Sequence, residues 1–271
     1  MNANPSRVVW SSENAGVYYS TSVGGSFTQS TGLPKGSRVE SDRVNPNTCY
    51  GYSGGTFYVS TNGGQTFTAA ATSLGTTGQF NAMPGAEGEI WLASDTGLYH
   101  STNSGSTFTQ LTASSSAVSI GFGGPAPGRT NRALYTMATI DGVRGVYRSD
   151  DSGVSWVRIN DDQHQYGNAG SAITGDPKIY GRVYLGTDGR GILVADPAGP
   201  PSTTATSRPP TSTPTSPPPT STPTSPPPPP TGTGGCSATF VRIGQWAPAA
   251  AASRARCGSP TPQRPAPRAG R

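Results

Sequence analysis

Four copies of one short motif, at near-constant spacing, constrain the fold of this chain more than any other feature. Their shared form is S-x-[D/N/S]-x-G-x-[S/T]-[F/W], and their first serines lie 40, 41 and 48 residues apart. A repeat of this length corresponds to one four-stranded blade of a β-propeller. The copies cover residues 20–27, 60–67, 101–108 and 149–156.

Each residue type of the motif has a mechanical reason. Ser, Asp and Asn side chains can bond nearby backbone amides and fix a turn, and the central glycine can adopt a positive φ. The final Phe or Trp is expected to pack between sheets as a large apolar anchor. We therefore predict a structural role, which also applies to the acidic pair Asp150 and Asp151. The residues assigned to this role are Ser20, Phe27, Ser60, Asn62, Phe67, Ser101, Asn103, Phe108, Ser149, Asp151 and Trp156, and the glycines are Gly24, Gly64, Gly105 and Gly153.

Strand-like runs precede each motif, and no stretch shows sustained helical periodicity. A fifth unit, residues 182–194, repeats the two strands without a motif after them. The predicted fold is all-β: a partial β-propeller of about five blade units, the end units incomplete, over residues 1–197. Trp10 and Trp91 lie in strand-like runs, so both are expected in the core rather than as sugar platforms.

The chain changes character after residue 197. Residues 198–234 are rich in Pro, Thr and Ser, with 14 of the 27 prolines between Pro200 and Pro230, which predicts an extended linker without a core. Residues 235–246 are interpreted as one strand. Residues 247–271 contain Ala, Pro, Arg and Gly with no acid, and we expect disorder there. We hypothesise that the reading frame changes just after Trp246.

Charge and targeting signals exclude several classes of function. All 14 acidic residues lie at or before Asp196, and the 12 basic residues in the same part of the chain give it a formal charge of about −2. The excess of basic residues therefore lies in the part of the chain after Asp196. We expect neither nucleic-acid binding nor, without an apolar run of about 18 residues, membrane insertion. The first ten residues do not resemble a signal peptide. Three cysteines, Cys49, Cys236 and Cys257, do not form a simple paired framework.

The motif resembles the Asp-box, which occurs in sialidases, sortilin-type receptors and family 74 glycoside hydrolases. Longer stretches resemble family 74: residues 41–47, 55–67, 161–168 and, most specifically, 173–192. The resemblance covers roughly residues 1–197. Cys236 to Trp246 resembles the start of a family 2 carbohydrate-binding module. This order of domains is typical of secreted plant-wall enzymes, so we expect a secreted parent protein although the chain itself shows no signal peptide.

The resemblance implies two seven-bladed propellers across a cleft and hydrolysis of the β-1,4-glucan backbone of xyloglucan with inversion, by one aspartate from each propeller. Those aspartates match no position here, so we expect no catalytic residue, and no cofactor or metal, in this chain. Trp246 matches a tryptophan of that module that stacks on cellulose. Cys236 matches the first cysteine of the module's disulfide, but Cys257 does not match the second. One strand cannot form the module, so we expect no cellulose binding.

Candidate substrate-binding residues lie in a polar loop between blade units, where Asp162, His164 and Tyr166 could line a sugar cleft. The alternative for this loop is a surface turn held by its Asp and Asn residues. Asp42 is a lone acid without an identifiable catalytic partner. Two other functions stay open: a non-catalytic propeller that binds a glycan or protein, and a sialidase, for which Arg129, Arg132 and Arg144 are present but not placed together.

Overall fold

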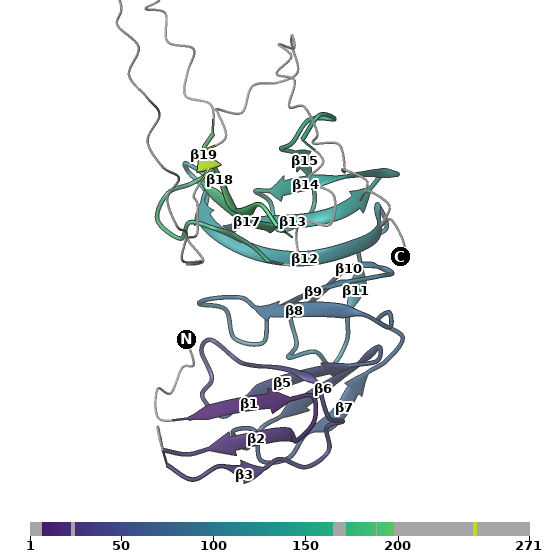
Figure 1. The fold of residues 1–271 in the computed structure, drawn as a ribbon, viewed down its shortest axis with the longest axis vertical. Coiled ribbons are helices and arrows are strands. Elements are labelled where there is room, and N and C mark those ends of the chain that lie inside the picture. The colour runs from purple at the N-terminus through teal and green to yellow at the C-terminus, as the bar shows by residue number, and fades with distance from the viewer. Residues whose placement is uncertain (1–6, 23–24, 165–171, 188, 198–240, 243–271) are drawn as a thin grey trace, which may run out of the picture.

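The computed structural model describes residues 7–22, 25–164, 172–187, 189–197 and 241–242. The described residues form five separate β-sheets and no helix, which confirms the predicted all-β partial propeller. Figure 1 shows the sheets stacked in chain order, from the purple first sheet to the green last one. No helix long and apolar enough to cross a membrane is present in these ranges.

Each sheet is a blade whose neighbouring strands follow one another in the sequence. Blade 1 has three strands, and the other blades have four. All strand pairs are antiparallel except the outermost pair of blade 5, β18–β19, which is parallel. The strands of blades 1 and 2 are β1 (Val8–Ser12), β2 (Gly16–Ser20), β3 (Thr28–Gln29), and β4 (Arg38–Ser41), β5 (Cys49–Ser53), β6 (Thr56–Ser60), β7 (Thr68–Ala71).

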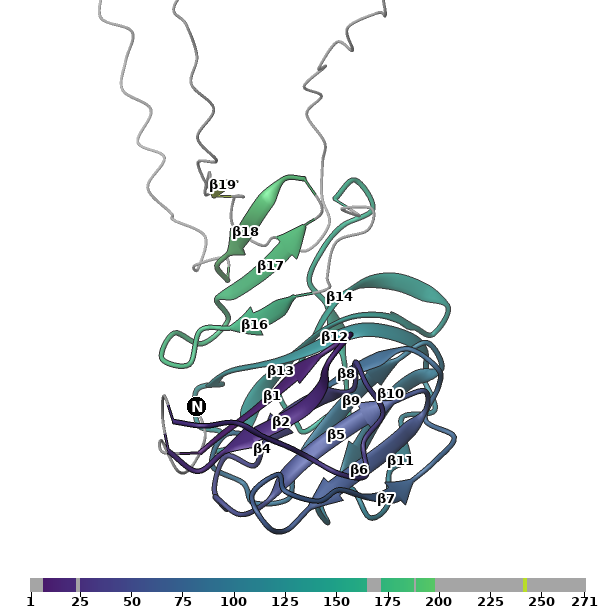
Figure 2. The ribbon, with the colours of Figure 1, turned by 60° about the horizontal axis from the view of Figure 1, so that its bottom comes forward.

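The remaining three blades continue in the same order. Figure 2 shows β16, β17 and β18 running alongside one another beyond β12. Their strands are β8 (Gly78–Ala82), β9 (Ile90–Ser94), β10 (Gly97–Ser101), β11 (Thr109–Gln110); β12 (Ser114–Pro125), β13 (Arg132–Ile140), β14 (Val143–Ser149), β15 (Val157–Arg158); and β16 (Ile173–Gly175), β17 (Val183–Thr187), β18 (Gly191–Ala195), β19 (Val241–Arg242).

The core consists of four apolar layers, one between each pair of successive blades. Because side chains alternate across a strand, one strand supplies both neighbouring layers. In β9, Ile90 and Leu92 pack toward blade 2, while Trp91 and Ala93 pack toward blade 4. All four are fully buried. The inner blades are therefore apolar on both faces, which is why stacking neighbours is required for stability.

The repeated motif forms the same hydrogen-bonded turn in blades 2, 3 and 4. In blade 3, the Ser101 hydroxyl donates to Asn103 Oδ1 (2.9 Å) and accepts the Gly105 N–H (3.0 Å). Asn103 Oδ1 also accepts the Thr107 N–H (3.0 Å). The matching contacts in blades 2 and 4 are 2.8–3.0 Å long. The first motif has Ser22 at the acceptor position, and there the Ser20 hydroxyl donates to the Ser22 carbonyl instead (2.6 Å).

The motif glycine also fits each blade against the preceding one. Gly64, Gly105 and Gly153 have φ of 89°, 76° and 83°; Gly24 lies outside the described residues. A Cβ on Gly105 would lie 2.2 Å from the Phe57 ring of blade 2, and one on Gly153 would lie 2.6 Å from the Trp91 ring of blade 3. The turn therefore requires glycine for its backbone conformation and for close contact between blades.

Two predictions of burial are wrong, for one physical reason. Trp10 is 52% exposed and Phe27 is 50% exposed, whereas Trp91 is fully buried as predicted. The motif aromatics Phe67, Phe108 and Trp156 pack in the layer toward the preceding blade. Blade 1 has no preceding blade among the described residues, so its equivalent side chains remain uncovered.

After residue 197, only residues 241–242 are described, and they form β19 of blade 5. The predicted linker at 198–234, most of the strand at 235–246 and the tail at 247–271 lie outside the described residues, as do Cys236, Cys257 and Trp246. Cys49 is a free, buried cysteine at the blade 1–2 layer.

Candidate functional site

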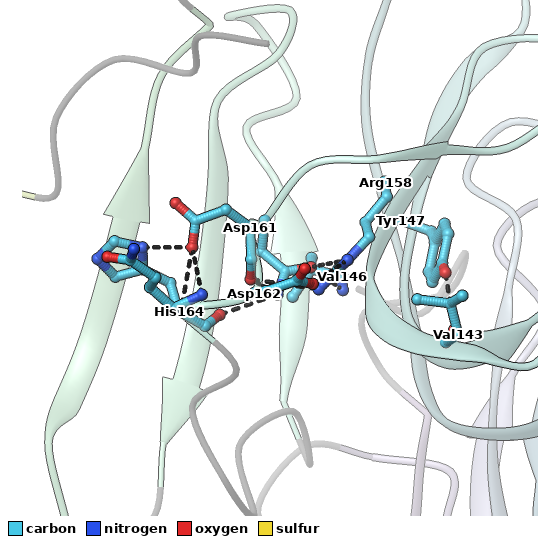
Figure 3. A network of polar contacts seen from close by, with 9 residues as sticks. Val143, Val146, Tyr147, Arg158, Asp161, Asp162 and His164 are labelled. Carbon is cyan, nitrogen blue, oxygen red and sulfur yellow. Dashed lines mark hydrogen bonds and ion pairs between the residues drawn. The ribbon is translucent and has the colours of Figure 1, made fainter. Parts of the chain in front are cut away.

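The candidate loop, residues 158–164, follows the outermost strand of blade 4 and is held by a dense polar network (Figure 3). Asp161 Oδ1 accepts the N–H groups of Gln163 (3.0 Å) and His164 (2.8 Å) and lies 2.6 Å from His164 Nδ1. Arg158 Nη1 donates to Asp162 Oδ1 (2.7 Å). These contacts curl the loop into a tight turn of the kind that an aspartate favours.

Asn160 connects this loop to the blade. Its Oδ1 accepts the buried Val146 N–H of β14 (2.8 Å), and its amide donates to the His164 carbonyl (2.9 Å). Because the loop is bonded to a blade strand at its base, His164 is presented at a defined place on the surface. Rigid presentation of loop residues by a scaffold is the usual arrangement of binding sites on such folds.

The loop brings together two of its three sequence-predicted residues. The side chains of His164 and Asp162 are 48% and 86% exposed. Tyr166 lies outside the described residues, as does Trp246. The polar pair His164–Asp161 and the ion pair Arg158–Asp162 therefore form a solvent-facing polar surface with hydrogen-bond donors and acceptors.

The protonation state of Asp161 bears on its chemistry. Burial acts to raise the pKa of Asp161, but hydrogen bonds from the His164 imidazole and backbone outweigh it and lower that pKa. A general acid at neutral pH needs a raised pKa. Asp161 is therefore a carboxylate suited to accepting hydrogen bonds, not to protonating a leaving group.

Asp42 is a structural carboxylate, fully buried between blades 2 and 3. Its Oδ1 accepts the N–H groups of Val44 and Asn45 (both 2.7 Å), and its Oδ2 accepts the Tyr50 hydroxyl (2.6 Å) and the Gly88 N–H of the next blade (2.9 Å). Burial acts to raise the pKa of Asp42, but these hydrogen bonds lower it. All acceptor positions serve the fold.

A second copy of this clamp was not predicted. Asp176 Oδ1 accepts the N–H groups two and three positions ahead (2.8 and 3.0 Å), and its Oδ2 accepts the Tyr184 hydroxyl (3.1 Å). In both copies a tyrosine lies eight residues after the aspartate. That Asp-x₇-Tyr spacing at the end of an innermost strand was the available sequence signal.

Glu40 is the described carboxyl group whose pKa is raised. It lies on the innermost strand β4, and burial raises its pKa against the opposing effects of Arg43 and of the Ala82 N–H. It pairs with Arg43 and accepts the Ala82 N–H of blade 3 (3.1 Å). These contacts connect two innermost strands, so Glu40 also serves blade packing.

Asp150 and Asp151 have separate structural partners. Asp151 accepts hydrogen bonds within the motif turn, whereas Asp150 accepts from Arg148 (3.1 Å) and from the Tyr180 hydroxyl of blade 5 (2.9 Å). No cluster of three metal-ligating side chains occurs in the described parts of the chain.

The comparisons with known proteins identify the propeller. The chain matches no protein-family model. It is 54% identical over 208 residues to a xyloglucanase from a Paenibacillus species, a match covering 73% of this chain and 20% of the relative. It is 46% identical over 199 residues to a xyloglucanase from Acetivibrio thermocellus, covering 72% of this chain and 24% of that protein.

Among solved structures, the GH74 enzyme of Niastella koreensis superposes with a TM-score of 0.66 and 38% identity, over 71% of this chain and 29% of that one. The chain therefore spans about a fifth to a quarter of the length of the curated relatives named above. The part of this chain that the comparisons match is about as long as the segment that forms the five blades.

Proposed function

Because this chain contains part of a β-propeller of glycoside hydrolase family 74, we propose that it serves in the degradation of xyloglucan. In this proposal the parent enzyme hydrolyses β-1,4-glucan backbone bonds with inversion. The five blades supply scaffold and one wall of the substrate cleft. The observation that carries the proposal is the 54% identity over 208 residues to a xyloglucanase. The relatives do not favour the sialidase or the non-catalytic propeller.

The catalytic pair is proposed to come from outside this chain. Inverting hydrolysis requires a general acid and a general base about 6.5–9.5 Å apart, with water between the base and the sugar. The candidate carboxylates of this chain have other partners: Asp42 holds two blades together, Asp151 holds a turn, and Asp161 holds His164. None of them is available to protonate a glycosidic oxygen.

The loop at residues 158–164 is proposed to contact the glucan chain. Its exposed Asp162 and His164 offer charged and imidazole groups to sugar hydroxyls, and Asn160 fixes their position. Contacts made equally to substrate and transition state affect KM rather than kcat. Loss of these side chains should therefore weaken substrate binding without slowing the chemical step.

The experiment that tests the activity uses two proteins. The 271-residue chain is incubated with xyloglucan, and release of oligosaccharides is measured. The matching segment of the Paenibacillus xyloglucanase is then replaced by residues 7–197 of this chain. We expect no release from the chain alone and retained hydrolysis by the chimera. Oligosaccharide release by the chain alone would refute the external catalytic pair, and an inactive, folded chimera would refute the shared function.

The loop is tested in the same chimera with His164→Ala and Asp162→Ala, and with Val154→Ala as the control. Val154 is 85% exposed and lies outside the loop. We expect KM for xyloglucan to rise about 3- to 10-fold in the loop variants, the equivalent of one lost hydrogen bond of roughly 0.5–1.5 kcal/mol, with kcat unchanged. An unchanged KM would show that the loop is only a surface turn.

We also propose that the parent protein is extracellular and that residues 198–234 act as a spacer between the propeller and the segment at 235–246. That segment is too short to form a sandwich. The chain should therefore stay in the supernatant when it is mixed with microcrystalline cellulose and centrifuged. Retention on cellulose that depends on Trp246 would contradict this reading.

A further inference from the structure

Two dipeptides of the blades can undergo the same spontaneous reaction but lie in opposite surroundings. The sequence contains one Asn-Gly pair, Asn62–Gly63, and two Asp-Gly pairs, of which Asp141–Gly142 lies wholly within the described residues. In such a pair the glycine nitrogen can attack the carbonyl carbon of the preceding side chain, because glycine has no side chain of its own to hinder the approach. In a folded chain the reaction then depends on whether the side chain and the nitrogen are free to meet.

The motif turn of blade 2 fixes both reacting groups of Asn62–Gly63. Asn62 Oδ1 accepts hydrogen bonds from the Ser60 hydroxyl (2.8 Å) and from the Thr66 N–H (3.0 Å). The Gly63 N–H donates to the Asn47 carbonyl (2.7 Å). Because the attacking nitrogen and the side chain that it would attack are both engaged, the turn must open locally before the reaction can start.

Asp141–Gly142 is the two-residue turn of the β13–β14 hairpin, between the paired residues Ile140 and Val143. Its φ angles of 50° and 77° are the positive pair of a type I′ turn. Both residues are exposed, and a Cβ on Gly142 would meet nothing within 4 Å. The backbone N–H of Asp141 donates to the Ala113 carbonyl (2.9 Å), whereas its carboxylate has no hydrogen bond within the described part of the chain. The side chain is therefore free to turn toward the Gly142 nitrogen.

We propose that Asp141 is a site at which the folded chain isomerises to isoaspartate, and that the motif turn protects Asn62 from the related deamidation. The Gly142 nitrogen bonds to Cγ of the protonated Asp141 side chain, the Cγ–OH bond breaks, and the amide proton leaves with the hydroxyl group as water. Water then adds to the main-chain carbonyl carbon of the cyclic imide, whose bond to nitrogen breaks as the nitrogen takes up a proton. The main chain now runs through Cβ and Cγ, and its mass is unchanged. At Asn62 the leaving group would be ammonia.

The added main-chain methylene would lengthen a turn that supports the candidate loop. The strand β14 starts directly after this turn, and its Val146 N–H donates to Asn160 Oδ1 at the base of the loop (2.8 Å). Because the geometry of a two-residue turn sets the register of its hairpin, isomerisation is expected to loosen β14 at this end. The reaction itself does not depend on the xyloglucan activity.

The test places the same dipeptide at both positions of one molecule. In the variant Asp141→Asn, positions 62 and 141 are both followed by glycine, and Asn-Gly is a favoured pair for a type I′ turn, so folding is expected to persist and is checked by circular dichroism. The 271-residue wild type and variant are incubated for several weeks at neutral pH, with and without urea. Protease digestion and chromatography coupled to mass spectrometry then follow deamidation by its mass change and isoaspartate by its altered retention.

For each position of the variant, the rate in the folded chain is divided by the rate in urea, which removes the effect of the local sequence. We expect this ratio to be at least about tenfold larger at position 141 than at Asn62, the factor that one hydrogen bond to be broken first supplies. The folded wild type should accumulate isoaspartate at Asp141 and retain the amide of Asn62. Equal ratios, a larger ratio at Asn62, or a folded wild type without isoaspartate at Asp141 would each overturn the proposal.

Discussion

Replacing Gly105 by alanine should separate the two reasons for a glycine in the repeated turn. Gly105 has φ of 76°, and a Cβ there would lie 2.2 Å from Phe57 Cε1 in the preceding blade. Gly128 is the matched control, since its φ is also 76° and a Cβ there would meet nothing within 4 Å. The two substitutions therefore share the backbone cost and differ only in the contact between blades.

The expected loss of stability has two contributions, the backbone conformation and the contact with Phe57. A residue with a Cβ in the left-handed region costs about 1–2 kcal/mol, which applies to both variants. The clash with a buried ring adds about 1–3 kcal/mol for Gly105→Ala, because a packed layer yields only by moving side chains off their rotamers. The expected losses are about 1–2 kcal/mol for Gly128→Ala and about 2–5 kcal/mol for Gly105→Ala, the latter a large part of the stability of a typical domain.

The assay is urea unfolding followed by tryptophan fluorescence, at protein concentrations where the chain is monomeric. Gly105→Ala should lower the midpoint more than Gly128→Ala does, with the same dependence on urea. Adding Phe57→Leu should reduce the extra loss in a double-mutant cycle, because it makes room for the new methyl group. Equal losses for the two alanine variants would refute the inference that the turn glycine fits one blade against the next.

Three further perturbations concern the polar groups of the blades. Asp42→Asn should cost about 2–3 kcal/mol, because it replaces a buried acceptor of charge-assisted hydrogen bonds. Hydrogen bonds from Tyr50 and the backbone lower the pKa of Asp42 despite its burial. The stabilisation from the ionised carboxylate is therefore present above about pH 4 and is lost as the pH falls through the pKa of the folded state. The difference in melting temperature between wild type and Asp42→Asn should accordingly become smaller at acid pH. Asp151→Ala should lower stability in urea by about 1–2 kcal/mol through the lost turn contacts, and no loss would show that the turn holds without its side chains. Ser22→Asn should instead raise the melting temperature, with a gain of up to about 1 kcal/mol, because an amide oxygen at that place could accept the Ser26 N–H as in the other blades; a loss would show that the first turn differs in kind.

The repeat made much of the blade architecture predictable. The motif spacing gave four blade units and the repeated pair of strands at residues 182–194 gave the fifth, and the strand-like run around Trp91 indicated that this side chain lies in the core. The Asp42 clamp, by contrast, depends on contact between residues 42 and 88, which belong to different blades. Local patterns carry no signal for such a contact, although the Asp-x₇-Tyr spacing shared with Asp176 and Tyr184 was visible in the sequence.

In the candidate loop, too, one part of the structure was predictable from the sequence and another part was not. Its Asp and Asn residues indicated a turn and a polar surface, but not that Asn160 would bond the Val146 backbone of β14 and the His164 carbonyl together. Nor did the sequence predict that Asp161 would be engaged by His164, which lowers its pKa. Sequence reasoning identified where the loop was, and the tertiary contacts determined what its carboxylates can do.

By itself, the sequence determined the blade repeat, the turn that closes each motif and the family, because these depend on residues close together in the chain. Only the tertiary structure decided which side chains are buried. Trp10 and Trp91 lie in similar strand-like runs, yet Trp91 is enclosed by the next blade and Trp10 is 52% exposed. In a stack of sheets, burial is set by the neighbouring blade, since no blade can cover its own apolar faces.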